Sequence, residues 1–195
     1  MNLPNKLTVM RMCLVPVIVV VLLLPVNIAT NILGAFIFIV TAITDAVDGK
    51  IARKRGLITD FGKFLDPLAD KFMVIGALMC IVYRDPDNKL IFSIFMPLIM
   101  ITIFRELAVA SIRLVAVTNA KVVVPANILG KIKTVSQIVL VMAVLLEPVL
   151  ARINFFFFFA YYPVTIAASV FVFIMTVWSG IVYIKTYWKY LDKNR

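Results

Sequence analysis

Histidine is absent from this 195-residue chain, and its absence removes several kinds of catalytic site. Without imidazole, the chain cannot build a Ser-His-Asp triad, a His-ligated zinc site or a phosphohistidine intermediate. Cysteine is scarce as well: Cys13 and Cys80 both lie in apolar stretches, which is typical of small core residues rather than of a disulfide framework. Any catalysis must therefore use carboxylates and cations.

Charged residues make up only 15% of the chain, whereas 63% is hydrophobic and the mean hydropathy is +1.05. So few charges cannot cover the surface of a water-soluble domain of this size, but a bilayer requires no polar cover. The composition therefore predicts an integral membrane protein, with residues 1–195 forming a single all-α transmembrane domain.

Acidic residues are outnumbered two to one, since 20 Lys and Arg face 10 Asp and Glu and give a net charge of +10. The basic residues are dispersed among apolar stretches instead of being gathered on a soluble module, which argues against a nucleic-acid partner. Membrane lipid headgroups and other phosphates are the partners that this charge favours.

Six mostly apolar stretches reach the length of about 20 residues that a spanning helix needs. The predicted spans are 5–24, 29–54, 63–83, 90–117, 127–148 and 162–188. Polar or turn-forming breaks separate them, and the last break contains Glu147, Pro148, Arg152 and an aromatic interfacial run at 155–159. The N-terminus lacks the features of a cleaved signal peptide, so we expect it to be retained.

The basic residues are distributed unevenly between the two sets of span ends. Arg84, Lys89 and Arg152 lie at one set of ends, and the other Lys and Arg residues lie at the opposite set. The positive-inside rule therefore predicts that both termini are cytoplasmic.

Four of the ten acids fall in two neighbouring predicted spans. Asp45 and Asp48 are three residues apart, and Asp66 and Asp70 are four apart, so each pair shares a helix face. Acids inside a membrane are costly, and four close carboxylates repel one another unless cations neutralise them. Hard oxygen ligands favour Mg²⁺, Mn²⁺ or Ca²⁺, so the pattern predicts a two-metal site, with salt bridges to nearby Lys and Arg as the structural alternative.

Small residues and one cation accompany these acids. Gly49 and Ala52 leave room for a ligand beside the helix, Gly62 opens the next span, and Arg53 can meet a phosphate. From Asp45 to Asp70 the chain reads D-x2-D-G-x2-A-R-x8-G-x3-D-x3-D. This pattern resembles the signature of the CDP-alcohol phosphotransferase family.

The resemblance implies a fold and a reaction. The fold is six transmembrane helices around a polar, metal-containing cavity open to the cytosol and to the membrane, in a protein that forms a homodimer. The reaction moves a phosphoalcohol group from a CDP-activated donor to an alcohol and releases CMP, with two divalent cations, Mg²⁺ or Mn²⁺, as cofactors.

The resemblance also implies roles for individual residues. Asp45, Asp48, Asp66 and Asp70 are the expected metal ligands, and Asp70 is also the expected proton acceptor. The residues expected to bind the CDP donor are Asn5, Thr8, Arg11, Gly49, Ala52, Arg53 and Thr59. For Asn5, Thr8 and Arg11, a helix start and membrane-surface anchor is the alternative interpretation.

The acceptor is indicated by other parts of the chain. The start P-N-x-L-T-x-x-R at 4–11, Arg105-Glu106 with Arg113, the segment 130–134 and, more weakly, Ser179-Gly180 with Tyr183 resemble the bacterial phosphatidylglycerophosphate synthases of this family. Those enzymes use CDP-diacylglycerol and glycerol 3-phosphate in the cytoplasmic membrane. A cardiolipin synthase with phosphatidylglycerol as acceptor and a divalent-cation transporter are the alternatives.

Four cations form the predicted site for the acceptor phosphate: Arg105, Arg113, Lys131 and Lys133. Arg105 and Arg113 are about 80° apart around a helix and need an anion, which Glu106 supplies only in part. Lys131 and Lys133 point about 200° apart, so which of them faces the acceptor stays open at this point. Cations that extend to the membrane surface are the structural alternative.

Overall fold

A computed structural model of the protein describes residues 3–55, 60–120, 128–152 and 162–191, with side chains described over 9–46, 68–115, 128–152 and 162–188. These residues form helices and short connections without a strand, as predicted. The helices are α1 (Leu3–Leu23), α2 (Ile28–Arg55), α3 (Asp60–Arg84), α4 (Lys89–Ala120), α5 (Ile128–Arg152) and α6 (Pro163–Leu191).

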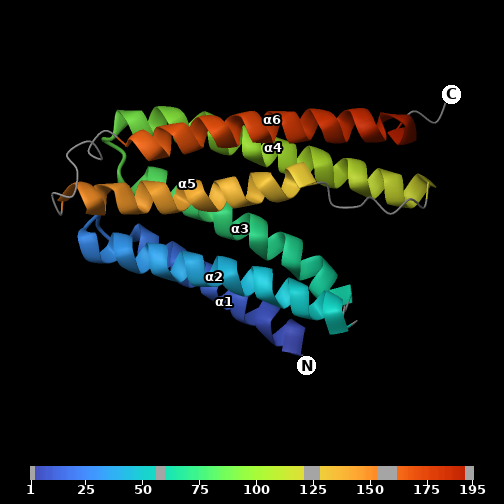
Figure 1. Cartoon of the computed structure of the whole chain (residues 1–195), viewed down its shortest axis with the longest axis horizontal. Helices are drawn as coiled ribbons and strands as arrows, with labels where there is room; N and C mark the ends of the chain where they lie inside the picture. The colour runs from blue at the N-terminus through green and yellow to red at the C-terminus, as the bar shows by residue number, and fades with distance from the viewer. Residues whose placement is uncertain (1–2, 56–59, 121–127, 153–161, 192–195) are drawn as a thin grey trace.

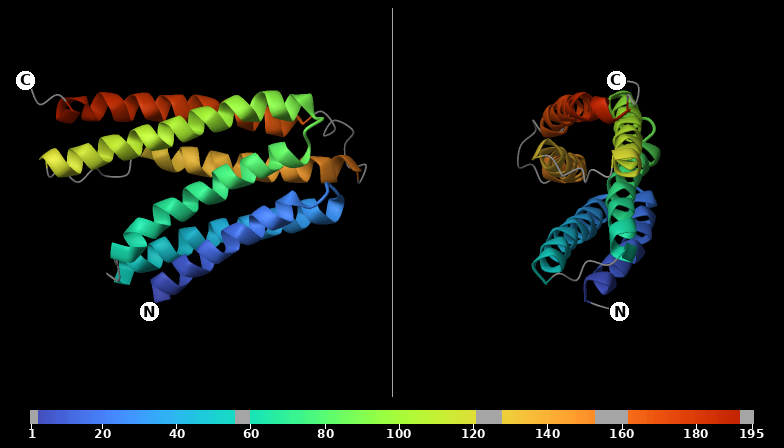
Figure 2. Two further views of the ribbon diagram at one scale, coloured as in Figure 1. Left: turned by 180° about the vertical axis from the view of Figure 1, so that it is seen from behind. Right: turned by 90° about the vertical axis from the view of Figure 1, so that its right-hand side faces the viewer.

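The helices pack as two groups of three (Figure 1). In one group α1 contacts α2 and α3, and in the other α6 contacts α4 and α5. Contacts of α2 with α5, and of α3 with α4 and α5, join the two groups, which are stacked in the end-on view of Figure 2. Helix α1 begins and α6 ends toward the same end of the bundle (Figure 1).

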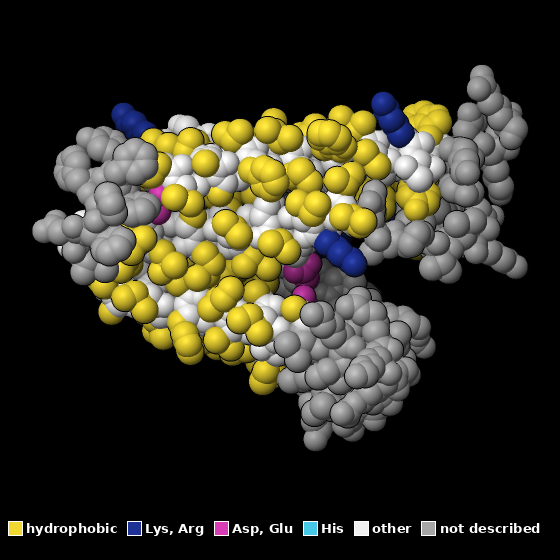
Figure 3. Space-filling view, in the orientation of Figure 1, with side chains coloured by type: hydrophobic (Ala, Val, Ile, Leu, Met, Phe, Trp, Pro, Cys, Tyr) yellow, Lys and Arg dark blue, Asp and Glu magenta, His cyan; other side chains and the backbone are white. Residues whose placement is uncertain are grey.

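The polarity of the bundle is that of a membrane protein. Large apolar side chains cover the outside (Figure 3), including Phe36 with 62% of its surface exposed and Phe104 with 74%. Within the described residues, four helices contain stretches long and apolar enough to cross a membrane, at Ile28–Ala46, Lys89–Val115, Ile128–Arg152 and Pro163–Trp188. Polar groups are instead buried, since Arg11, Asn31 and Thr102 are almost inaccessible.

Asparagine side chains start two of the helices. Thr30 donates its backbone N–H to Asn27 Oδ1 (2.8 Å), and Thr30 Oγ1 in turn accepts the N–H of Asn27 (3.1 Å), which is a reciprocal cap at the start of α2. At the start of α4, Asn88 Oδ1 accepts the N–H of Ile91 (3.2 Å). These caps lie in the breaks predicted after the first and third spans.

The prediction that Glu147, Pro148 and Arg152 lie in a break between spans is wrong, because α5 continues to Arg152. The Glu147 side chain is buried, and its carboxylate accepts the N–H groups of Val164 (2.7 Å) and Thr165 (2.9 Å). A carboxylate is favourable at the N-terminus of a helix, where the first N–H groups have no partner within the helix. Glu147 is therefore an interior residue of α5, and its side chain caps the N-terminus of α6.

We expect Glu147→Ala to destabilise the bundle by about 2 kcal/mol, because two N–H groups at the start of α6, one of them buried, lose their acceptor. Glu147→Gln retains one oxygen acceptor, so it should lower the stability by about half as much. The measurement is the midpoint of thermal unfolding in detergent, followed by circular dichroism. An alanine variant as stable as the unmodified protein would show that the cap contributes nothing.

Candidate active site

One cavity of about 1020 Å³ receives side chains from α2, α3, α4, α5 and α6. Figure 3 shows a hollow between the two helix groups, with acidic side chains inside it and a basic side chain at its edge. The described acids and cations from the sequence predictions, other than Arg11, all line this cavity. They are Asp45, Asp70, Arg105, Arg113, Lys131 and Lys133.

The acidic side of the cavity is formed by Asp45 of α2 and Asp70 of α3. Arg11 of α1 is fully buried, and its Nη1 lies 2.5 Å from Asp45 Oδ1. A side chain with no exposed surface does not act as a surface anchor, so the anchor interpretation of Arg11 is wrong. The guanidinium instead neutralises one of the two carboxylates across the α1–α2 contact.

Several predicted residues lie where the side chains are not described. Asp48 and Asp66 fall within α2 and α3, one turn from Asp45 and Asp70 respectively. No group of three or more possible metal ligands occurs among the described side chains. The four-carboxylate site therefore stays a prediction. The donor-binding roles also stay predictions, because the side chains concerned are not described: Asn5 and Thr8 in α1, and Gly49, Ala52 and Arg53 in α2. Thr59 lies outside the described residues.

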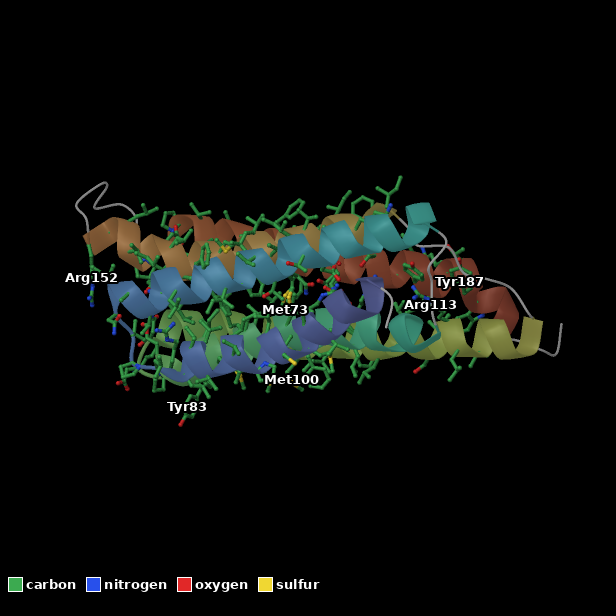
Figure 4. All side chains as sticks on the ribbon, turned by 90° about the horizontal axis from the view of Figure 1, so that it is seen from below. Met73, Tyr83, Met100, Arg113, Arg152 and Tyr187 are labelled. Atoms are coloured by element: carbon green, nitrogen blue, oxygen red, sulfur yellow. The ribbon has the colours of Figure 1, made fainter. Side chains whose placement is uncertain are left out.

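The basic side of the cavity comes from α4 and α5. Lys133 is buried, with 4% of its surface exposed, whereas Lys131 is exposed at the edge of the cavity. This difference agrees with the opposite directions expected for residues two apart in a helix. Arg105 is also buried, whereas Arg113, two turns further along α4, is exposed. In Figure 4, Arg113 lies toward the same end of the bundle as Tyr187.

Glu106 connects the cations. Its Oε1 accepts hydrogen bonds from Lys133 Nζ and from Arg105 Nη1 (2.9 Å), and its Oε2 lies 3.6 Å from Lys71 Nζ. Lys71 of α3 also belongs to the basic side, which its position directly after Asp70 in the sequence does not indicate. The sequence does place Glu106 beside Arg105, but only the fold brings α3 and α5 to it.

Helix α6 supports Arg105 from the other side. The Arg105 guanidinium lies over the Tyr183 ring, 5.6 Å from its centroid, and Tyr183 stacks with Tyr187 at 5.9 Å. A Cβ on Gly180 would lie 3.3 Å from Arg105 Cγ, so the glycine permits close approach of α6 to this side chain. Gly180 and Tyr183 of the sequence pattern in α6 therefore help to hold the Arg105 side chain in place.

Arg105 retains an unused donor. Its buried Nε has no hydrogen-bond partner among the described residues, although Nη1 is bound to Glu106. A buried guanidinium donor without a partner is unfavourable, and an anion in the cavity would satisfy it. The cavity is therefore suited to hold an anionic group on the α4–α5 side and a hydroxyl near the carboxylates on the α2–α3 side.

Comparison with known proteins identifies relatives over the whole chain. The family model described as CDP-alcohol phosphatidyltransferase matches residues 1–182. A Bacillus subtilis protein named CDP-diacylglycerol–glycerol-3-phosphate 3-phosphatidyltransferase is 38% identical, over 99% of this chain and 95% of its own length. Proteins of the same name from Haemophilus influenzae and Pseudomonas fluorescens are 34% identical (94% and 92% covered) and 30% identical (100% and 94% covered).

We expect Glu106→Gln to destabilise the protein by about 3 kcal/mol, because Lys133 and Arg105 then lie buried without their common counter-charge. The double variant Glu106→Gln with Lys133→Met should recover part of this loss, since one buried cation is removed as well. Thermal unfolding in detergent gives both values, with Lys185→Met at an exposed position of α6 as control. Strictly additive single and double variants would contradict the pairing.

Proposed function

The chain belongs to the CDP-alcohol phosphatidyltransferase family, and we propose that it transfers the phosphatidyl group of CDP-diacylglycerol to sn-glycerol 3-phosphate, releasing CMP. The names of the relatives support this acceptor. The observation that carries the proposal is that one cavity is lined by Asp45 and Asp70 together with Arg105 and Lys133. An acceptor with a phosphate at one end and a nucleophilic hydroxyl at the other matches this arrangement.

In this proposal the phosphate of glycerol 3-phosphate binds on the basic side. Arg105 offers its unpaired Nε, Lys133 lies beside it, and Arg113 and Lys131 add positive charge nearer the cavity edge. Glu106 neutralises part of this charge and holds Arg105 and Lys133 together. A dianionic phosphate therefore enters a site that retains net positive charge without it.

The acidic side would hold two divalent cations, Mg²⁺ or Mn²⁺. Asp45 and Asp70 supply hard oxygen donors from adjacent helices in the same cavity, and Asp48 and Asp66 of those helices complete the proposed ligand set. When bound, such cations neutralise the pyrophosphate of the donor and stabilise the departing CMP. The donor residues proposed are Asn5, Thr8, Gly49, Ala52, Arg53 and Thr59, whereas Arg11 is buried against Asp45 and would act on the donor only through that carboxylate.

Asp70 is the proposed general base. The primary hydroxyl of the acceptor attacks the β-phosphorus of the donor, the bond from that phosphorus to the CMP oxygen breaks, and Asp70 takes the hydroxyl proton. Asp70 lines the same cavity as Arg105 and Lys133, so an acceptor whose phosphate is bound by these basic side chains can present its far end to this carboxylate. Anchoring of this kind converts a collision between two molecules into a reaction within one complex.

The proposed topology has six membrane spans and cytoplasmic termini, with the cavity open to the cytosol for the acceptor and to the bilayer for the acyl chains. The excess of Lys and Arg at one set of helix ends supports this orientation. Helix α1 begins and α6 ends toward the same end of the bundle, which suits an even number of spans. We also propose that the protein is located in the bacterial cytoplasmic membrane and forms a homodimer.

The direct test is CMP release by the purified protein in detergent micelles. We expect release only when CDP-diacylglycerol, glycerol 3-phosphate and Mg²⁺ or Mn²⁺ are all present, and loss of release on chelation. Product analysis with labelled acceptor should give phosphatidylglycerophosphate. Release that is undiminished without glycerol 3-phosphate, or that requires phosphatidylglycerol instead, would refute the acceptor. Metal flux into sealed vesicles without nucleotide would favour a transporter.

Asp70→Asn should lower kcat by about a thousandfold, because the amide accepts no proton from the hydroxyl. The KM for glycerol 3-phosphate and the unfolding midpoint should change little, since the phosphate site lies on α4 and α5. Asp87→Asn, in the exposed connection between α3 and α4, is the matched control and should retain full turnover. Near-normal turnover of the Asp70 variant would remove its role as base.

A further inference from the structure

Two buried polar side chains in the cavity have no role in the mechanism above. Thr102 of α4 and Gln137 of α5 both line the cavity and expose only 1% and 3% of their surface. Thr102 Oγ1 and Gln137 Nε2 have no hydrogen-bond partner among the described residues. Buried polar groups in proteins are nearly always hydrogen-bonded, and a polar group bound in the cavity would give each of these atoms a partner.

Neighbouring hydroxyls behave differently. Thr134 also lines the cavity, but its Oγ1 donates to Gly130 O (3.1 Å), and Ser136 Oγ donates to Lys133 O (2.7 Å). These groups satisfy themselves on their own helix, as Ser and Thr in membrane helices commonly do. Of the two threonines in the cavity lining, Thr134 is therefore bonded to its own helix and Thr102 is not, and Gln137 Nε2 likewise has no partner among the described residues.

The positions of the two residues relate them to the phosphate site. Thr102 precedes Arg105 by three residues in α4, and Gln137 follows Lys133 by four in α5, so each lies about 4.5 to 6 Å along its helix from a phosphate-binding cation. Helix α4 runs toward the α4–α5 connection and α5 runs away from it (Figure 1). Thr102 and Gln137 therefore both lie further from this connection than Arg105 and Lys133, and are displaced from them in the same direction, into the bundle. This displacement is comparable to the span from the phosphorus to the carbon-2 hydroxyl of an extended glycerol phosphate.

We propose that Thr102 and Gln137 bind the secondary hydroxyl of glycerol 3-phosphate and thereby select this acceptor. The inference rests on the proposed function. With the phosphate on the cations and the primary hydroxyl at Asp70, the hydroxyl on carbon 2 is the remaining polar group of the acceptor. Gln137 Nε2 donates to its oxygen, and the hydroxyl donates its proton to Thr102 Oγ1, so both unpaired groups gain a partner.

The test compares two acceptors, sn-glycerol 3-phosphate and 3-hydroxypropyl phosphate, which lacks only the secondary hydroxyl. The unmodified protein should favour glycerol 3-phosphate by about 10- to 100-fold in kcat/KM, because the analogue leaves buried polar groups unpaired. In Thr102→Val and Gln137→Leu this ratio should fall at least about fivefold, through loss of activity on glycerol 3-phosphate alone. The KM for CDP-diacylglycerol should not change.

Matched variants separate recognition from packing. Thr134→Val removes a cavity-lining hydroxyl that is already bonded to its own helix, so the ratio should stay that of the unmodified protein. Thr102→Ser restores the hydroxyl and should restore the ratio, and Thr102→Ala replaces the valine variant if that variant does not accumulate. Because the readout is a ratio between two acceptors on the same preparation, a general loss of folded protein cancels.

Two results would overturn the inference. Equal use of both acceptors by the unmodified protein would show that the secondary hydroxyl is not bound. An unchanged ratio in both variants, whether activity is retained or lost equally on both acceptors, would show that Thr102 and Gln137 hold water or serve the packing. In both cases glycerol 3-phosphate is still used and the proposed function stands, whereas absence of turnover with either phosphorylated acceptor refutes the function and the inference together.

Discussion

The cost of holding charge inside an apolar helix bundle determines how this protein is arranged. A charge in such a site is tolerated only with a partner close by, and here the partners come from different helices. Glu106 of α4 binds Lys133 of α5 and lies beside Lys71 of α3, and Arg11 of α1 pairs with Asp45 of α2. The pairs that neutralise the buried charges also join the helices that surround the cavity.

This pairing leaves the cavity divided by charge. Asp45 and Asp70 come from α2 and α3, whereas the cations that exceed the charge of Glu106 come mainly from α4 and α5, with Lys71 of α3 beside them. A substrate with an anionic end and a hydroxyl end is therefore oriented by electrostatics before any finer contact forms. Arg105 Nε, Thr102 Oγ1 and Gln137 Nε2, which have no partner among the described residues, can then form hydrogen bonds with a polar ligand or water.

Much of the fold follows from the sequence, because each helix is recognisable from its own apolar stretch and the capping asparagines lie in the connections. The prediction fails at Glu147, where polarity and the adjacent proline suggest a break. The side chain is in fact satisfied by the first N–H groups of α6, a partner that is distant in sequence and therefore invisible to any local pattern. Prolines within α1, α4 and α5 are tolerated for the related reason that neighbouring helices support them.

The sequence by itself determined the class of protein, the positions of its helices and the residue types of the site, because hydropathy, helical spacing and the absence of histidine are properties of the chain alone. Only the tertiary structure decided that Lys133 lies buried and Lys131 at the edge, that Lys71 joins the basic side, and that Gly180 and Tyr183 of α6 support Arg105. Each of these depends on which helices lie side by side. Spacing along one helix gives the relative directions of its side chains, but the packing of neighbouring helices decides which direction faces the cavity.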